Sequence, residues 1–205
     1  TSLKYKDGDE PFIEFPSSNT HELLVFTNKS QVYKCKVASF EDTKSAQLGS
    51  YLPTDLEMDP DEVVTWVIDP EDYKADVLFV FENGRVARIA LAGYVTKTNR
   101  KRLKNAIYGG SKLLFAQVLK EERDLALVSS DYRLMNFNTS LLKTKTTTST
   151  QGVQAFTSKA NRIITNVGIT EDFLGASVSA GKFTAQSLPS SGAPMKEDDM
   201  PSLFD

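Results

Sequence analysis

The chain has very few of the side chains that build catalytic or metal centres. It contains one cysteine, Cys35, so an internal disulfide and a cysteine-rich metal site are excluded and a reducing compartment is indicated. We expect Cys35 in the core, because free cysteine behaves as a small hydrophobic side chain. The only histidine, His21, has no partner set for a metal or a catalytic triad, and we expect it on a surface turn.

Long apolar runs are also missing. No run approaches the roughly 18 residues that a membrane span requires, and no charged-then-apolar leader precedes the first predicted strand. We therefore expect no membrane partner and a cytoplasmic location. The chain begins at Thr1, on what looks like the approach to a strand, and we expect it to be a piece of a longer polypeptide.

Charge of either sign does not dominate the whole chain. The apolar fraction of 40% and the charged fraction of 25% are typical of a soluble globular protein, and the net charge is −3. The distribution is less even than the sum, because residues 97–104 carry five cations and no acid, whereas residues 197–205 carry four acids and no cation. A near-neutral total can therefore hide a basic surface.

The most informative feature of the sequence is a β-hairpin pattern that is repeated three times. Each copy is an apolar strand, a short polar turn and a second strand, at residues 23–34, 77–88 and 125–136. Val32, Val86 and Leu134 occupy matching places, 54 and 48 residues apart. A period near fifty residues with strands in each unit indicates blades or a solenoid, whose units must pack against their neighbours to bury both faces.

Each hairpin is followed by a polar stretch and then another strand. We expect these later strands at residues 63–68, 113–119 and 163–169, and we interpret residues 11–15 as the later strand of a truncated preceding repeat. The first hairpin strands are apolar on both faces, which is typical of strands covered on two sides. Asn83-Gly84 predicts a type I′ turn.

No segment keeps a helical period over three turns. We therefore predict an all-β, closed or C-shaped array of repeated four-stranded blades with little helix. Residues 1–175 would form this domain, with three recognisable blades and parts of a fourth. Residues 176–205 would be a closing segment, part of which can complete a blade, and an acidic tail that we expect to be disordered.

Three stretches carry a resemblance to a known family. They are residues 22–37 (ELLVFTNKSQVYKCKV), residues 97–102 (KTNRKR) and residues 145–154 (KTTTSTQGVQ). The first is similar to the family pattern E-L-L-F-F-T-N-K-G-x-V-Y-x-L-K-V, and the last to a basic-rich segment that ends in Gly-Val. On these motifs the chain resembles the C-terminal domain of bacterial type IIA topoisomerase A subunits, those of DNA gyrase and topoisomerase IV. The resemblance covers roughly residues 4–170.

The resemblance implies a β-pinwheel, propeller-like in outline, that binds double-stranded DNA around a basic perimeter and wraps or bends it. It implies no catalysis and no cofactor in this chain. The catalytic core of the same polypeptide and the ATPase B subunit would hold the chemistry, ATP and Mg²⁺. The gyrase motif Q-R-R-G-G-K-G is absent from this chain, which favours topoisomerase IV-like bending over a full wrap.

The candidate DNA-binding residues are cations, because phosphate neutralisation releases counterions whatever the sequence. They are Lys97, Arg100, Lys101, Arg102 and Lys104 in the second repeat, Lys143 and Lys145 in the third, and Lys34, Lys36 and Arg88 on second hairpin strands. By alternation the last three point away from the core, opposite to Tyr33 and Cys35. The competing interpretations are a solvated loop, a polar strand edge and protection of an edge strand by charge.

Other polar and aromatic groups are interpreted as structural. We expect Trp66 and Tyr73 in the core, and the acids at positions 59, 61, 62, 69, 71 and 72 in exposed loops, because their spacing does not match a calcium loop. The alternative function is a propeller-like scaffold for protein partners. A hydrolase is disfavoured because convergent histidines and paired acids are missing. Salt-dependent DNA binding would separate the first interpretation from both alternatives.

Overall fold

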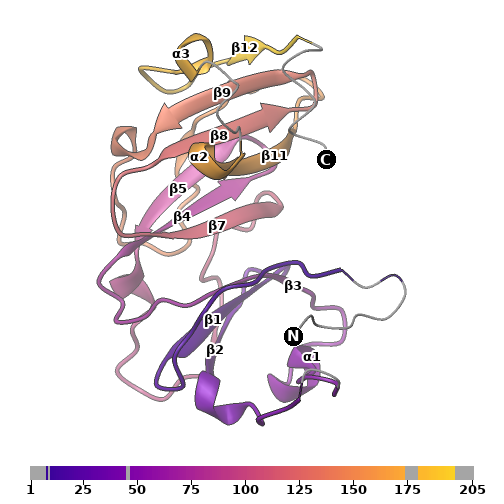
Figure 1. The fold of residues 1–205 in the computed structure, drawn as a ribbon. Coiled ribbons are helices and arrows are strands. Elements are labelled where there is room, and N and C mark those ends of the chain that lie inside the picture. The colour runs from indigo at the N-terminus through magenta and orange to yellow at the C-terminus, as the bar shows by residue number, and fades with distance from the viewer. Residues whose placement is uncertain (1–7, 9, 45–46, 174–179, 197–205) are drawn as a thin grey trace.

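The chain folds into three antiparallel sheets that follow one another in chain order (Figure 1). The computed structural model describes residue 8 and residues 10–44, 47–173 and 180–196. Each sheet has four strands, and the described helices are short. The prediction of an all-β array of four-stranded blades is therefore confirmed, and we name the sheets blades one, two and three. The predicted acidic tail, residues 197–205, lies outside the described residues.

The strands of each blade are given in their spatial order. Blade one contains β3 (Val64–Ile68), β1 (Glu22–Thr27), β2 (Val32–Lys36) and β6 (Arg102–Leu103). Blade two contains β10 (Val153–Gln154), β5 (Arg85–Ala90), β4 (Asp76–Phe81) and β7 (Leu113–Leu119). Blade three contains β11 (Ile164–Ile169), β8 (Asp124–Ser129), β9 (Arg133–Asn138) and β12 (Ala193–Pro194). The helices are α1 (Leu52–Asp55), α2 (Thr170–Phe173) and α3 (Ala180–Phe183), with 3-10 turns η1 (Val37–Ser39), η2 (Leu91–Tyr94) and η3 (Thr139–Leu141).

The predicted hairpins and later strands match the structure to within a residue or two, but residues 11–15 form no strand. Proline at positions 11 and 16 brackets that segment, and proline cannot donate to a sheet and restricts the residue before it. Phe12 instead packs its ring edge-on against Trp66, with 5.3 Å between ring centroids. The interpretation of this segment as a strand is therefore wrong.

The three hairpin turns share one geometry. Ser30, Gly84 and Tyr132 occupy the same position and all have positive φ, at 58°, 80° and 56°. The amide of each donates to the carbonyl three residues earlier, as in the 2.9 Å bond from Gly84 to Phe81. Asn83 is not in the left-handed region, so the predicted type I′ turn is wrong. A three-residue loop needs one left-handed residue rather than two.

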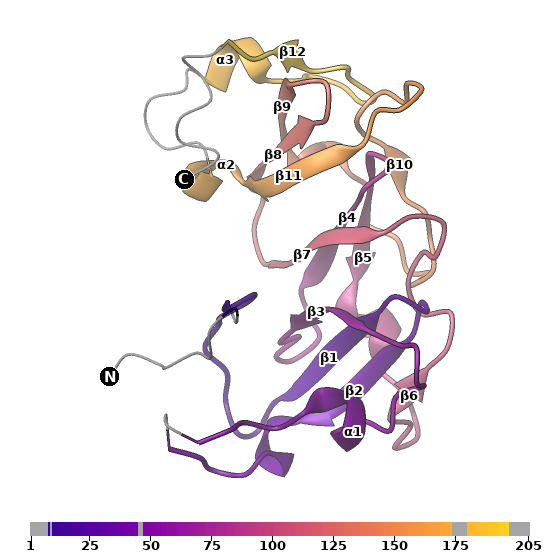
Figure 2. The same cartoon turned by 90° about the vertical axis from the view of Figure 1, so that its right-hand side faces the viewer.

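Each blade is completed by a strand from the following segment of the chain. The pairs are β6 with β2, β10 with β5, and β12 with β9. The labels β6 and β10 stand on the same side of the molecule in Figure 2. In blade three the pairing strand, β12, comes from the segment predicted to close the domain. This exchange carries the basic stretch of the second repeat to the outer edge of blade one.

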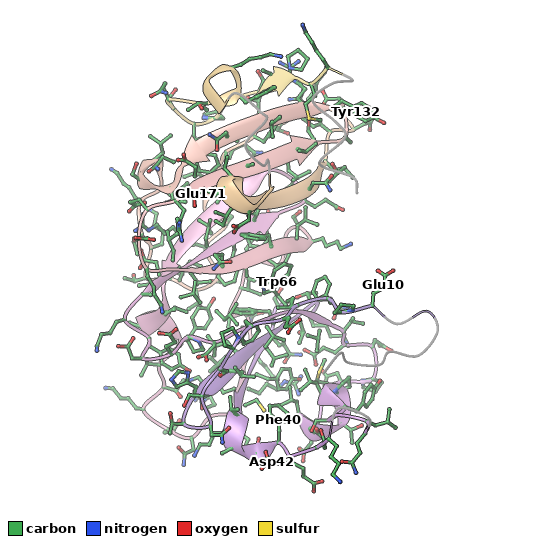
Figure 3. All side chains as sticks on the ribbon, viewed as in Figure 1. Glu10, Phe40, Asp42, Trp66, Tyr132 and Glu171 are labelled. Atoms are coloured by element: carbon green, nitrogen blue, oxygen red, sulfur yellow. The ribbon has the colours of Figure 1, made fainter. Side chains whose placement is uncertain are left out.

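The core runs between blades rather than inside each one. On β4, Phe79 faces blade one, where its ring lies edge-on to Phe26 at 5.0 Å between centroids. The next residue, Leu78, belongs to the cluster shared with Leu125 and Leu127 of blade three. Trp66 lies between blades one and two (Figure 3), against Phe115. First hairpin strands are therefore covered on both faces, as predicted.

Candidate nucleic-acid interface

The basic stretches of the second and third repeats are held by backbone hydrogen bonds along the outer edge of the preceding blade. The Lys34 amide donates to the Lys101 carbonyl at 2.7 Å. In blade two, the Lys145 amide donates to the Arg88 carbonyl at 2.8 Å and the Ala90 amide donates to the Lys145 carbonyl at 2.9 Å. The main chain is thus fixed against the sheet, and the cationic side chains lie on its rim.

Most of the predicted DNA-binding cations are exposed and carry no ion pair within the described part of the chain. We call these residues the basic rim: Lys36, Lys97, Arg100, Lys101, Lys104, Lys143 and Lys145. An exposed cation without a carboxylate partner can meet a phosphate without first breaking an internal contact. The basic rim is therefore the part of the predicted site that can release counterions on binding DNA.

The structure places Lys34 in an internal contact instead. Its side chain lies on the same face of β2 as Val32, which belongs to the core shared by blades one and two, so the prediction that it points away from the core is wrong. Its side chain is 8% exposed and lies 3.4 Å from a carboxylate oxygen of Glu22. Its ammonium also stands 5.3 Å from the centre of the Tyr73 ring and donates to Thr96. Tyr73 donates to the same Glu22 carboxylate at 2.6 Å. Lys34 therefore links β2 to its neighbours under the basic stretch.

Arg88 is the equivalent residue of blade two and is also paired. It bonds to Asp76 at 2.6 Å and to Glu122 at 2.8 Å, and its side chain is 16% exposed. Glu22 and Asp76 both begin a first hairpin strand, so the hairpin register itself contained the signal for these pairs. In blade three the matching residue is Asn136, which is buried under the closing segment and bonds to Thr184.

Arg102 is bound by a cluster of acidic and polar side chains that the sequence analysis did not predict. It bonds to Asp59 at 2.6 Å and to the Gln31 side chain, and its guanidinium lies 5.5 Å from the centre of the Tyr33 ring. Behind this contact stands Glu62, which is 5% exposed and accepts hydrogen bonds from Gln31 at 2.8 Å and from Tyr33 at 2.7 Å. The prediction that Glu62 lies in an exposed loop is wrong, because these donors bury it.

Hydrogen bonding decides the charge state of this buried carboxyl. Burial alone would raise the pKa of Glu62, but donation from Thr27, from Tyr33 and from the Asp59 amide lowers it overall. The Arg102 guanidinium holds the pKa of Asp59 below its usual range. Both groups are thus anionic at neutral pH and complementary to the arginine.

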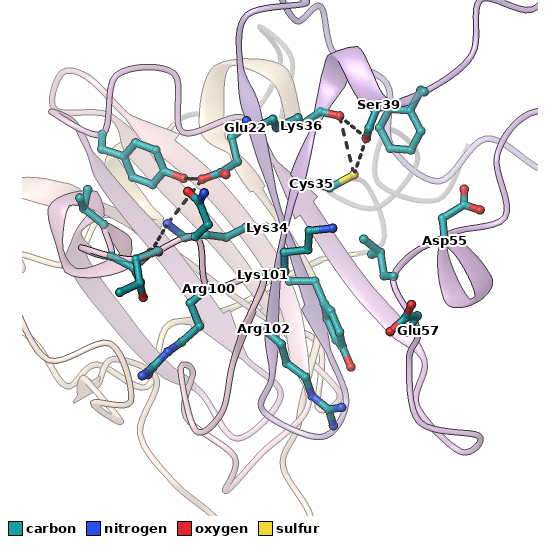
Figure 4. A pocket seen from close by; sticks show the side chains of 18 residues that line it. Glu22, Lys34, Cys35, Lys36, Ser39, Asp55, Glu57, Arg100, Lys101 and Arg102 are labelled. Atoms are coloured by element: carbon teal, nitrogen blue, oxygen red, sulfur yellow. Dashed lines mark hydrogen bonds and ion pairs between the residues drawn. The ribbon is translucent and has the colours of Figure 1, made fainter.

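A groove of about 910 Å³ lies between β2, the basic stretch and the loop that contains α1. Its lining includes Lys36, Arg100 and Lys101, together with the acids Asp55 and Glu57 (Figure 4). In Figure 4 the side chains of Arg100 and Arg102 point in different directions, and only Arg102 belongs to the acidic cluster. Neighbouring cations of one stretch therefore have different roles.

The only histidine and the only cysteine of the chain both have structural roles. His21 bonds through Nδ1 to Asp69 at 2.7 Å, and Ser17 donates to the same carboxylate oxygen at 2.6 Å, so serine and histidine do not form a triad. Cys35 is buried, as predicted, and burial raises the pKa of its thiol. Among the described residues no group of three or more histidines, cysteines and acids could hold a metal ion. No helix in that part of the chain is long and apolar enough to cross a membrane.

Comparison with curated proteins finds A subunits of DNA topoisomerase 4. The chain is 24% identical over 172 residues to the A subunit of DNA topoisomerase 4 from Staphylococcus aureus strain MSSA476, a match that covers 82% of this chain and 21% of the relative. Its homologues are A subunits of topoisomerase IV. The chain spans about a fifth of the length of these topoisomerase subunits. No family model matches the chain.

Solved structures give the same answer for the fold. The C-terminal domain of DNA topoisomerase IV has a TM-score of 0.69 at 23% identity, covering 82% of this chain and 52% of that one. The DNA gyrase A C-terminal domain has a TM-score of 0.61 at 16% identity, covering 93% and 65%. The E. coli ParC C-terminal domain has a TM-score of 0.63 at 14% identity, covering 82% and 69%. The fold is therefore the β-pinwheel of the C-terminal domains of gyrase A and ParC, as the sequence motifs predicted.

Proposed function

We propose that this chain is a non-catalytic double-stranded DNA-binding domain of a type II topoisomerase A subunit, which bends or wraps DNA. The observation that carries the proposal is the basic rim. Strand exchange brings six of its cations to the outer edges of blades one and two, beside Lys36 on β2, and none of the seven has an ion pair within the described residues. Homology to the A subunits of topoisomerase IV supports the same assignment.

The distribution of charge explains how a chain of net charge −3 can bind a polyanion. Phosphate contacts act locally, since exposed charges separated by more than about 8–10 Å are screened at physiological salt. The outer edge of blade three differs, because residues 183–195 of the closing segment contain no lysine or arginine. The DNA path would therefore follow blades one and two.

The parent enzyme would supply the chemistry around this domain. Residues 1–175 would act as the DNA-binding domain beside the catalytic core of the same polypeptide. The ATPase B subunit would supply ATP hydrolysis, with Mg²⁺ bound elsewhere in the assembly. Because its substrate is chromosomal DNA, the assembly would act in the bacterial cytoplasm. This chain would supply no catalytic group and would hold the DNA segment that the core manipulates.

The test is binding of a short duplex by the whole chain, followed by fluorescence anisotropy between about 50 and 200 mM salt. The unaltered chain should bind with a steep salt dependence, because each phosphate contact adds about 0.9 to the slope of log K against log salt. The triple variant Lys97→Ala, Arg100→Ala, Lys101→Ala should lower the slope by about 2–3 and weaken binding at least tenfold.

A second triple variant provides the matched control. Lys29→Ala, Lys112→Ala and Lys159→Ala remove the same charge from the turn of blade one and from the loops before β7 and β11. The control should change affinity by no more than about twofold. Equal losses in both variants would mean diffuse attraction rather than a rim. No salt-dependent binding by the unaltered chain would overturn the proposal and favour a protein-binding scaffold.

A further inference from the structure

Every blade holds its exchanged strand with a side chain as well as with the backbone. In blade three, Arg133 donates to the carbonyls of Ser191 and Gly192 at 2.6 and 2.7 Å. In blade two, the matching residue Arg85 donates to the Gly152 carbonyl at 3.5 Å. In both cases the hairpin supplies the cation and the incoming segment supplies backbone oxygens.

In blade one the cation comes from the exchanged strand instead of from the hairpin. Its matching residue is Gln31, and the cation, Arg102, comes from the incoming strand itself. The contact therefore needs an anion on the hairpin side, and Asp59 supplies it at 2.6 Å. Buried Glu62 fixes Gln31 and Tyr33 from behind, and its second carboxylate oxygen accepts from the Asp59 amide at 3.1 Å. The acidic loop and the basic stretch thus form one connected network.

We propose that Asp59 is a positioning residue for DNA binding, which acts through Arg102 to hold the stretch 97–104 in register on β2. The inference rests on the proposed function. Arg102 lies next to Lys101, whose carbonyl accepts a hydrogen bond from the Lys34 amide. The other cations of the stretch, Lys97, Arg100 and Lys104, lie within a few residues of it. Arg102, although basic, then serves as the anchor of the rim rather than as one of its free cations.

If Asp59 has a positioning role, neutralising it should weaken DNA binding, which is the opposite of the effect expected from charge alone. An aspartate close to a DNA-binding rim repels phosphates, so replacing it with a neutral residue should strengthen binding if only net charge matters. If Asp59 positions the stretch, the same replacement releases Arg102 and spreads the neighbouring cations over many conformations. DNA binding must then order the stretch again, and affinity falls.

The first arm of the experiment uses no DNA. Amide hydrogen exchange is followed by NMR in the unaltered chain and in Asp59→Asn. The Lys34 amide, which donates to Lys101, should lose protection about tenfold or more, because the stretch opens locally. The Ala90 amide, which donates to Lys145 in blade two, is the internal reference and should not change. Equal protection of Lys34 in both proteins would overturn the inference.

The second arm measures duplex binding with Glu57→Gln as the matched control. Glu57 lines the groove beside Arg100 and Lys101, and its side chain has no ion pair or hydrogen bond among the described residues. Both variants remove one negative charge. Glu57→Gln should bind at least as tightly as the unaltered chain, whereas Asp59→Asn should bind about three- to tenfold more weakly and with a shallower salt slope. Asp59→Glu, which keeps the carboxylate, should restore most of the affinity.

The outcomes separate the two proposals. If the unaltered chain binds DNA and Asp59→Asn binds as tightly as Glu57→Gln or more so, only the positioning role is overturned. If the unaltered chain does not bind DNA, the proposed function fails and the positioning role fails with it. A thermal melt followed by Trp66 fluorescence accompanies each variant, so that global unfolding is recognised as a separate effect.

Discussion

Residues of one type have different roles in this chain, and a nearby carboxylate decides which role each takes. Lys101 and Arg102 are neighbours, yet Lys101 is exposed without an ion pair in the described structure and Arg102 is bound to Asp59. Lys34 and Lys36 lie on the same strand face, yet only Lys34 meets an acid, Glu22. A count of cations therefore overestimates the number that can contact a phosphate.

A single glycine controls how the exchanged strand enters blade two. Gly152 has a φ of 67°, and a Cβ at this position would collide with the Val86 carbonyl. We predict that Gly152→Ala lowers the free energy of unfolding by about 2–3 kcal/mol, since it combines a left-handed backbone with a collision against main chain. Urea denaturation measures the change.

Gly49→Ala is the control for this prediction. Gly49 has no positive φ, and a Cβ there would meet nothing within 4 Å. Its free energy of unfolding should change by less than about 0.5 kcal/mol. Similar effects at both glycines would show that the crossing into blade two tolerates a side chain.

At the scale of elements, the exchanged strand turns a row of separate hairpins into a linked array. Each of the exchanged strands β6, β10 and β12 has only two residues and therefore forms few backbone hydrogen bonds. Side-chain hydrogen bonds of Arg102, Arg85 and Arg133 add to them. The segments of β6 and β10 also carry six of the seven cations of the basic rim. If the rim binds DNA as proposed, stability and binding share these segments but use different side chains within them.

Arg88 and Lys145 provide a direct comparison of these two uses on the edge of blade two. Arg88→Gln should lower the free energy of unfolding by about 2 kcal/mol or more, because it leaves Asp76 and Glu122 without their mostly buried partner. Lys145→Gln should leave stability within about 0.5 kcal/mol and weaken duplex binding several-fold. Urea denaturation and anisotropy, run on both variants, measure the two effects.

The pair of variants also carries its own control. Each replacement removes one positive charge, so any difference in DNA affinity comes from position rather than from net charge. Arg88→Gln should bind DNA within about twofold of the unaltered chain once folded. A larger loss of affinity for Arg88→Gln than for Lys145→Gln would place Arg88 on the DNA and contradict the assignment of the rim.

At the scale of the whole molecule, the blades share their cores. One cluster joins Phe26 of blade one to Phe79 and Phe81 of blade two, and a second joins Leu78 of blade two to Leu127 of blade three. Because β4 contributes to both clusters from its opposite faces, blade two cannot unfold without exposing apolar surface on both neighbours. The described blades should therefore unfold together rather than one by one.

Phe79→Ala tests this coupling. The side chain is fully buried between blades one and two, so truncation should lower the free energy of unfolding by about 3–5 kcal/mol. Fluorescence of Trp66, the only tryptophan, and far-UV circular dichroism should report the same urea midpoint. Phe12→Ala is the control, since Phe12 is 72% exposed although it also touches Trp66, and should cost less than about 1 kcal/mol. Two separate transitions in Phe79→Ala would contradict a shared core.

The sequence by itself determined the repeated hairpins and the strand after each polar stretch. These features follow from alternation and turn residues, which act over a few positions. The resemblance to the family motifs then predicted the β-pinwheel fold. The rim cations Lys36, Lys97, Arg100, Lys101, Lys104, Lys143 and Lys145 were also predicted, because exposed charge leaves a local signature.

Only the tertiary structure decided which cations are already paired and which blade each exchanged strand completes. Arg102 meets Asp59 across 43 residues of chain, and Glu62 meets Gln31 across 31. Such contacts depend on how distant loops are brought together, and neither the spacing nor the chemistry of a single stretch encodes them. For that reason Glu62 looked like one more exposed acid in a loop, and Arg102 like one more member of a basic run.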